Sequence, residues 1–247
     1  MTEPSNSGFV SLVGAGPGHP DYLTLRGATA LARAEVIVYD ALLDPSFRDR
    51  FPASAKAHFV GKRCGHHSAT QAEINALLVS EARRGRRVVR LKGGDPGIFG
   101  RLGDELSALI EAGIPHEIIP GVSALTAGAA LAGFPLTLRG TACEILIING
   151  HDIGKPDYDF RPLAAFAGTL VVFMGAAALS TLAAGMLAAG AAQDRPVTLV
   201  EGASMADQRI VRATLTEAAE GRVVRKTDKP GIIYVGQVAA TGTVPAT

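Results

Sequence analysis

The chain has 247 residues, of which 47% are hydrophobic and 19% charged, a composition that excludes a disordered or nucleic-acid-coating protein. Its 24 basic and 23 acidic side chains nearly cancel, so local arginines rather than a global field must hold any anionic ligand. This length fits one large α/β domain or two of about 120 residues each.

The first elements suggest a nucleotide fold but do not match its fingerprint. Residues 9–13 form a short apolar strand that runs into the sequence GAGPGHP at positions 14–20. The GxGxxG motif of NAD-binding proteins needs glycine at the sixth position, where this chain has His19, and Pro17 and Pro20 delay the next helix until about Thr24. We therefore do not expect NAD binding.

The next strand, residues 36–39, ends at Asp40. In open α/β folds the carboxyl ends of parallel strands are where ligands bind, so Asp40 either contacts a ligand or caps its own loop. The following loop, residues 59–68, contains Cys64, His66 and His67, but two adjacent histidines rarely share one ion and no carboxylate pattern supports them. We expect no metal.

Two Thr-x-x-Glu patterns predict helix starts. Thr70 and Glu73 form a capping box for a helix that stops at Gly85, and Thr214 and Glu217 form a second one.

The stretch 89–103, VRLKGGDPGIFGRLG, is where we expect the chemistry. A buried strand, residues 87–91, enters a loop with four glycines around Asp95 and Pro96, and Arg101 opens the next helix beside Asp104. Glycines let a backbone approach a ligand closely, although an ordinary strand-to-helix turn also uses them. The spacing does not fit a Walker phosphate loop, because Gly94 and Gly100 enclose five residues and no lysine follows.

A helix over 104–112 and a strand over 116–119 complete a mostly parallel α/β pattern, and the turn Pro120-Gly121 marks a boundary. We predict an N-terminal α/β domain over residues 8–119 and a C-terminal α/β domain over 120–242, with Ser123 as N-cap of the next helix. Arg139 is the only charge between Glu117 and Glu144, so it is either a structural ion-pair partner or a ligand anchor.

The second half repeats the alternation of strands and helices. Strands are predicted over 143–149, 169–174, 197–201, 209–213 and 232–236, and a helix over 177–189. The strand ends carry small residues, and no catalytic triad, zinc helix or close carboxylate pair stands out, which favours a binding wall over a hydrolytic centre.

The uncharged stretch 162–193 is long enough for a bilayer of ~20 apolar residues. Glycines interrupt it, and Leu179, Leu182 and Met186 share one helix face, so we predict a buried strand and a packed helix instead of a membrane span. Cys64 and Cys143 are isolated and the N-terminus lacks a secretion signal, so we expect a cytoplasmic protein.

Six segments together resemble one family. VGAGPGHPDYLTLRGATAL, VIVYDALL, VGKR, VRLKGGDPGIFGR, PGVSA and NGHD are similar, in order and spacing, to motifs of the tetrapyrrole methyltransferases, and within them of the uroporphyrinogen-III C-methyltransferases. The resemblance covers nearly the whole chain. It implies two α/β domains with mixed, mostly parallel sheets, a cleft between them that binds S-adenosylmethionine (SAM), and a homodimer.

The resemblance also implies site residues. The cofactor-binding positions are Pro17, Gly93, Gly94, Asp95, Ile98, Ser123, Ala124, Val172, Met174, Ala203, Pro230 and Ile232. The substrate-facing, catalytic positions are Asp40, Arg101, Asp104, Arg139 and Met174.

The implied reaction converts uroporphyrinogen III to precorrin-2 and leaves S-adenosylhomocysteine (SAH). An electron-rich pyrrole carbon attacks the sulfonium methyl in line, so the protein mainly aligns two bound reactants. Arg101 and Arg139 would orient the substrate's carboxylates, and Asp40 or Asp104 would accept pyrrole N–H hydrogen bonds or a proton.

The chain departs from the family pattern at Leu102, Asp104, Leu138 and Asn149, all on the substrate side. Two alternatives therefore stay open: a sister methylase acting on a later corrin precursor or another substrate, and a non-catalytic SAM-binding protein. The pathway that uses the product, sirohaem, cobalamin or haem d1, stays open as well.

Overall fold

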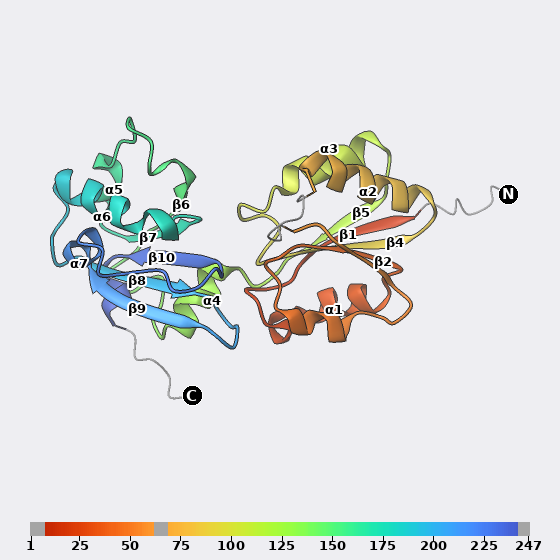
Figure 1. Cartoon of the computed structure of the whole chain (residues 1–247), viewed down its shortest axis with the longest axis horizontal. Helices are drawn as coiled ribbons and strands as arrows, with labels where there is room; N and C mark the ends of the chain where they lie inside the picture. Colours follow the sequence, from red (N-terminus) through yellow and green to blue (C-terminus); the bar gives the residue numbers. More distant parts are fainter. Residues whose placement is uncertain (1–7, 62–68, 242–247) are drawn as a thin grey trace. The chain divides into compact units, whose positions relative to one another are not determined.

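The computed structural model describes residues 8–61 and 69–241, which divide into two compact units, with the boundary along the chain between Ser123 and Ala124 (Figure 1). Residues 62–68, which include the Cys64, His66 and His67 considered above as metal ligands, lie outside the described residues, as does the predicted domain limit at residue 242.

The first unit is a parallel sheet covered on both faces. Its five strands run in the order β3-β2-β4-β1-β5, and every pairing is parallel. The strands are β1 (Phe9–Gly14), β2 (Val36–Tyr39), β3 (Lys56–Phe59), β4 (Arg87–Lys92) and β5 (His116–Ile119). Helix α1 (Leu25–Ala32) lies on one face, and α2 (Gln71–Arg83) and α3 (Leu102–Glu111) lie on the other (Figure 1).

The central strands are apolar because both of their faces are covered. Along β4, Val88 packs into the cluster under α2 and α3, whereas Val89 and Leu91 pack into the cluster under α1. Strands β1 and β4 are neighbours, yet the helices that follow them lie on opposite faces of the sheet. That is a topological switch point, where open α/β sheets bind ligands.

The second unit contains a mixed five-stranded sheet in the order β6-β7-β10-β8-β9. Its strands are β6 (Ile145–Asn149), β7 (Thr169–Phe173), β8 (Pro196–Glu201), β9 (Arg209–Thr214) and β10 (Gly231–Val235). Its helices are α4 (Ala124–Leu131), α5 (Arg161–Ala165), α6 (Leu179–Ala188) and α7 (Leu215–Ala219).

The predicted fold class, two α/β domains with mixed, mostly parallel sheets, is confirmed as α/β with two sheets, but mostly parallel pairing holds for the first sheet alone. The first sheet is wholly parallel, whereas β7–β10, β10–β8 and β8–β9 in the second are antiparallel and only β6–β7 is parallel. Strand periodicity reports which face is buried but not strand direction, so the sequence pattern could not distinguish the two sheets.

The local predictions about helices hold. Both capping boxes form, at Thr70 and at Thr214. Leu179, Leu182 and Met186 are buried on one face of α6. The uncharged stretch is divided among α5, β7 and α6, and no helix within the described ranges is long and apolar enough to cross a membrane.

Candidate functional site at the strand ends

The loops after β1 and β4 are joined backbone to backbone at the carboxyl edge of the first sheet. Gly94 donates its N–H to the carbonyl of Gly16 at 2.6 Å, and Gly16 donates in return to Gly94 at 3.2 Å. Both glycines have positive φ angles, 85° at Gly16 and 69° at Gly94, which a side chain would strain. The glycines therefore set the path of both loops.

Asp95 ties a third loop, the one after β5, to the same edge. Its Oδ1 accepts the N–H of Gly97 at 2.8 Å and its Oδ2 accepts the N–H of Gly121 at 2.9 Å. A Cβ added to Gly121 would overlap the carbonyl oxygen of Gly94 and come within 2.7 Å of the Gly14 Cα. Asp95 and Gly121 thus build the edge, and the carboxylate of Asp95 is already occupied by two backbone donors.

The residues of the first unit that the family resemblance assigns to the cofactor are brought to this one edge. They are Pro17 after β1, Gly93, Gly94, Asp95 and Ile98 after β4, and Ser123 at the end of the segment after β5, and each is half-buried.

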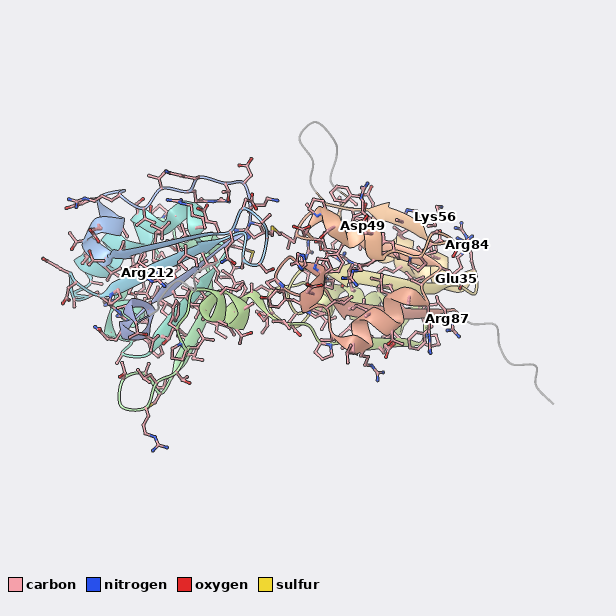
Figure 2. The ribbon with its side chains drawn as sticks, turned by 90° about the horizontal axis from the view of Figure 1, so that it is seen from below. Glu35, Asp49, Lys56, Arg84, Arg87 and Arg212 are labelled. Atoms are coloured by element: carbon pink, nitrogen blue, oxygen red, sulfur yellow. The ribbon has the colours of Figure 1, made fainter. Side chains whose placement is uncertain are left out.

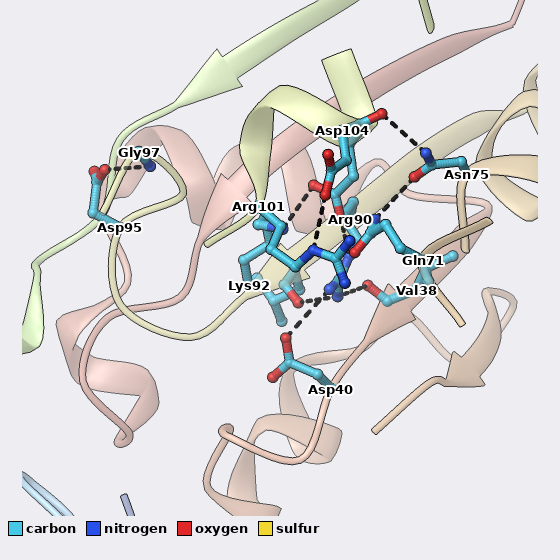
Figure 3. Close-up of polar contacts among 12 residues, drawn as sticks. Val38, Asp40, Gln71, Asn75, Arg90, Lys92, Asp95, Gly97, Arg101 and Asp104 are labelled. Atoms are coloured by element: carbon cyan, nitrogen blue, oxygen red, sulfur yellow. Dashed lines mark hydrogen bonds and ion pairs between the residues drawn. The ribbon is translucent and has the colours of Figure 1, made fainter. Parts of the chain in front are cut away.

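A buried charge cluster that sequence reasoning missed lies directly beneath this edge. We call Asp40, Arg90, Lys92 and Glu105 the buried quartet; Figure 3 labels the first three. Glu105 on α3 is fully buried, and its two oxygens meet Arg90 Nε at 2.9 Å and Lys92 Nζ at 2.7 Å. Arg90 reaches Asp40 Oδ2 at 3.3 Å, so Asp40 both caps its loop, by accepting the Leu42 N–H, and pairs with a buried cation.

Burial, together with the nearby Arg90, lowers the pKa of Lys92, and the ion pair with Glu105 opposes that change. The quartet contains two cations and two carboxylates, so it carries no net charge when all four are ionised. Arg90 and Lys92 point to the same face of β4 because they are two residues apart. Two cations at that spacing in an otherwise apolar strand were the signal that could have revealed the cluster.

Arg101 and Asp104 form a separate, exposed pair above the quartet. Arg101 Nε donates to Asp104 Oδ2 at 2.8 Å, and the two side chains are 64% and 48% exposed. Asn75 on α2 donates to the backbone carbonyl of Asp104 at 2.9 Å and so fixes the first turn of α3 (Figure 3). The arrangement leaves most of the Arg101 guanidinium open to solvent.

The amino edge of the first sheet carries charges of another kind. Lys56, Arg84, Arg87 and Glu35 gather there (Figure 2). Glu35 accepts the backbone N–H of Arg87, and the buried Glu81 pairs with Arg84 at 2.8 Å. These groups lie at the start of the strands, away from the ligand edge that parallel sheets use.

In the second unit, antiparallel pairing gathers four of the predicted residues, Met174, Ala203, Pro230 and Ile232, and Ala124 begins α4. Ile232 opposes Phe173, so Met174 at the end of β7 lies beside the start of β10. Gly202 donates its N–H to the carbonyl of Pro230 at 2.9 Å, which brings the Ala203 segment to the same edge. Met174 is 43% exposed there, whereas Ala203 and Ile232 are 6% and 4% exposed.

Two predicted positions differ from the rest. Val172 is fully buried in the core of the second unit, so its side chain supports the edge but presents no surface. Arg139 lies on the exposed turn closed by the Leu138–Ala142 bridge, and it has no ion pair within the ranges 8–61 and 69–241. Of the two readings of Arg139, a structural partner of a buried acid is therefore not supported.

Backbone strain marks the same two edges. Across the described ranges, the non-glycine residues with positive φ are Phe99, Arg101, Met174 and Ser204, with angles between 50° and 66°. Two follow β4 and two follow β7 and β8. Each such conformation costs of the order of 1 kcal/mol and persists where surrounding structure imposes it, which is typical of binding sites. No group of three metal-ligating side chains occurs in the part of the chain that the structure describes.

The fold is that of an α/β protein of two units, each of which brings loops and strand ends together at one edge of its sheet. The family model "Tetrapyrrole (Corrin/Porphyrin) Methylases" matches residues 10–219. The chain belongs to the tetrapyrrole methylase family, which confirms the resemblance found in its motifs.

Comparisons with single proteins are consistent with membership of this family. The chain is 42% identical over 241 residues to siroheme synthase 2 of Cronobacter sakazakii, covering 97% of this chain and 52% of that protein. It thus spans about half the length of the curated relatives it matches. It is also similar to uroporphyrin-III C-methyl transferase of Thermus thermophilus complexed with S-adenyl homocysteine, with 39% identity, a TM-score of 0.78, and coverage of 93% and 97% of the two chains. A cobalt precorrin-4 methyltransferase structure has 26% identity, a TM-score of 0.81, and coverage of 96% and 97%.

Proposed function

We propose that this chain is a SAM-dependent C-methyltransferase that converts uroporphyrinogen III to precorrin-2 by methylation at C2 and C7. The observation that carries the proposal is the glycine-built edge of the first sheet, in a chain that is similar over nearly its full length to a uroporphyrin-III C-methyl transferase holding SAH. The 26% identity to the cobalt precorrin-4 enzyme makes a later corrin precursor the weaker candidate substrate.

The residues present fit SAM. Gly93 and Gly94 lack side chains where a ligand would lie against the loop after β4, and the positive φ of Gly94, 69°, would strain a residue that has a Cβ. Pro17, Asp95, Ile98 and Ser123 are the other positions of the first unit that the resemblance assigns to SAM. In the second unit it assigns Ala124, Met174, Ala203, Pro230 and Ile232, with Val172 supporting them from the core. SAM supplies an electrophilic methyl group, and no metal is required.

The side chains at the edges would handle the tetrapyrrole. Arg101 and Arg139 are exposed guanidinium groups, able to bind substrate carboxylates in a bidentate way that lysine cannot reproduce. Asp40, held by Arg90, would accept hydrogen bonds from pyrrole N–H groups, and Asp104 would orient Arg101. Met174 would contact substrate and cofactor. The protein's part in the reaction is alignment of the pyrrole carbon with the methyl group.

Anaerobic incubation with SAM and uroporphyrinogen III, followed by detection of methylated tetrapyrrole, tests the activity. A parallel assay with later corrin precursors separates the sister methylase, and a chain that binds SAM without turnover on any of them is a non-catalytic binder.

Calorimetry tests the cofactor. We expect one SAM or SAH per chain and no NAD binding, and Gly94→Val should abolish SAH binding because a branched side chain cannot adopt this backbone. Saturable NAD binding without SAM heat would refute the assignment.

Two further parts of the proposal are a homodimer and a cytoplasmic location. Family membership supports the first, and sedimentation of the purified chain measures it. The exposed free thiol of Cys143 favours a reducing compartment, which localisation of a tagged chain would test.

A further inference from the structure

The buried quartet contains one residue whose contacts suggest a role in the reaction beyond packing. We propose that Arg90 is a positioning residue for Asp40: it transmits the fixed location of the buried Glu105 to the carboxylate that faces the tetrapyrrole. This inference rests on the proposed function, because that function is what makes Asp40 a substrate contact.

All three nitrogens of the Arg90 guanidinium are committed. Nε donates to Glu105 Oε1 at 2.9 Å, one terminal nitrogen donates to the carbonyl of Leu91 at 3.0 Å and to that of Val38 at 3.4 Å, and the other points to Asp40 Oδ2 at 3.3 Å. The side chain is 6% exposed. Three contacts hold this planar fork at two of its nitrogens, so the direction of the third nitrogen is fixed, and its contact determines where the Asp40 carboxylate lies.

Glu105 is the fixed end of this chain of contacts. Its side chain is fully buried, and its second oxygen is held by Lys92 at 2.7 Å. Lys92 and Arg90 come from β4 and Glu105 from α3, so the reference point belongs to the core of the first unit and not to a mobile loop.

Asp40 is the only member of the quartet with appreciable exposure, since its side chain is 21% exposed against 6% or less for the other three. Its Oδ1 accepts the Leu42 N–H at 3.0 Å and its Oδ2 meets Arg90, so both oxygens are oriented while each keeps acceptor capacity for a ligand donor. The network therefore opens to solvent at the one group that the proposed function uses.

Stability alone does not account for such a cluster. Buried ion pairs are often no more stabilising than apolar residues of the same volume, because desolvation offsets their attraction. A neutral network that ends in an oriented carboxylate at a ligand edge is better explained by positioning.

A double-mutant cycle between Arg90 and Asp40 tests the proposal. Variants Arg90→Gln, Asp40→Asn and the double change are compared for binding of uroporphyrin III, followed by its fluorescence, and for kcat and KM with uroporphyrinogen III. We expect Arg90→Gln to weaken uroporphyrin III binding about tenfold in the native background, a typical coupling for contacting residues, and less than about twofold in Asp40→Asn. SAH affinity should stay unchanged in all three. Equal losses in both backgrounds would overturn the proposal.

Arg195→Gln is the matched control. Arg195 is also buried, and it donates to the carbonyls of Leu163, Ala164 and Phe166 in the second unit. Arg195→Gln should lower the melting temperature, but any effect on uroporphyrin III binding should be the same in the native chain and in the Asp40→Asn chain.

Arg90→Lys replaces Arg90→Gln if the latter does not fold, since it keeps the charge but cannot span Glu105 and Asp40 together. If the native chain neither binds uroporphyrin III nor methylates uroporphyrinogen III, the proposed function fails, and the crystal structure of the Arg90 variant then decides the positioning role. An Asp40 carboxylate unmoved in that structure would overturn it, and a displaced or multiply placed one would support it.

Discussion

Replacing Gly121 with alanine should show whether the edge of the first sheet is built by backbone-to-backbone packing. The new methyl group would overlap the Gly94 carbonyl oxygen and lie within 2.7 Å of the Gly14 Cα. Overpacking of this kind costs about 1–3 kcal/mol, and the upper value applies because the obstructing atoms are backbone and cannot rotate away. At roughly 2–4 °C per kcal/mol for a chain of this size, the melting temperature should fall by up to about 6–12 °C.

The same displacement should weaken SAH binding, since it separates the loop after β5 from the loop after β4. A loss of about 3 kcal/mol corresponds to roughly 150-fold in Kd, measured by calorimetry well below the melting temperature. Gly103→Ala is the control, because a Cβ there meets no atom within 4 Å and alanine favours the helix. A Gly121→Ala chain with native stability and native SAH affinity would refute this account of the edge.

Three other predictions use thermal stability or kinetics. Tyr234→Phe removes the hydroxyl that donates to the carbonyls of Ala124 and Leu125 in α4, and it should lower the free energy of unfolding by about 1 kcal/mol. The same hydroxyl would overlap a Cβ at Gly128, so Gly128→Ala should be less destabilising in the Tyr234→Phe chain than in the native chain. Additive losses of stability would contradict this contact. Burial, and then the neighbouring cations, lower the pKa of His58 below its usual 6.5. As the pH drops below about 6.5, the unfolded chain therefore takes up a proton before the folded chain does, and the free energy of unfolding decreases as the solution becomes more acidic. Melting temperatures from pH 7.5 to 5 should therefore change less in His58→Gln than in the native chain, and equal slopes would refute this. Arg139→Lys should lower kcat/KM about 10- to 150-fold, equivalent to ~1.5–3 kcal/mol, without changing stability or SAH affinity, and native turnover would sink the anchor role.

Local sequence signals predicted the elements and much of the first edge. Capping boxes, glycines after apolar strands and alternating strands and helices depend on neighbouring residues, so they can be recognised without the fold. The predicted loop positions after β1, β4 and β5 meet at one edge because parallel strands place their carboxyl ends together. The sequence alone showed that such loops exist, and the parallel pairing explains why they converge.

Non-local pairings were beyond the sequence. The quartet joins residues from β2, β4 and α3, and no local pattern links Asp40 to a residue fifty positions later. The antiparallel run β7-β10-β8 likewise depends on tertiary pairing, and it is what places Met174 beside the start of β10. Val172 shows the converse: a residue carried over by motif lies in the packed core, where its role is to support its neighbours.

The positions at which this chain departs from its family can now be sorted by what they contact. Asn149 accepts the N–H of His151 and so caps the turn after β6, a structural role that asparagine fills as threonine can. Leu102 is partly buried against the cluster under α2 and α3 and faces the core. Leu138 is 40% exposed beside Arg139, and Asp104 holds Arg101 at the surface. Two of the four departures, Leu138 and Asp104, thus lie beside the arginines proposed to bind carboxylates. None of the four departures takes part in the glycine contacts that join the loops after β1, β4 and β5. Differences in activity from relatives should therefore arise in KM for the tetrapyrrole, with the affinity for SAM preserved.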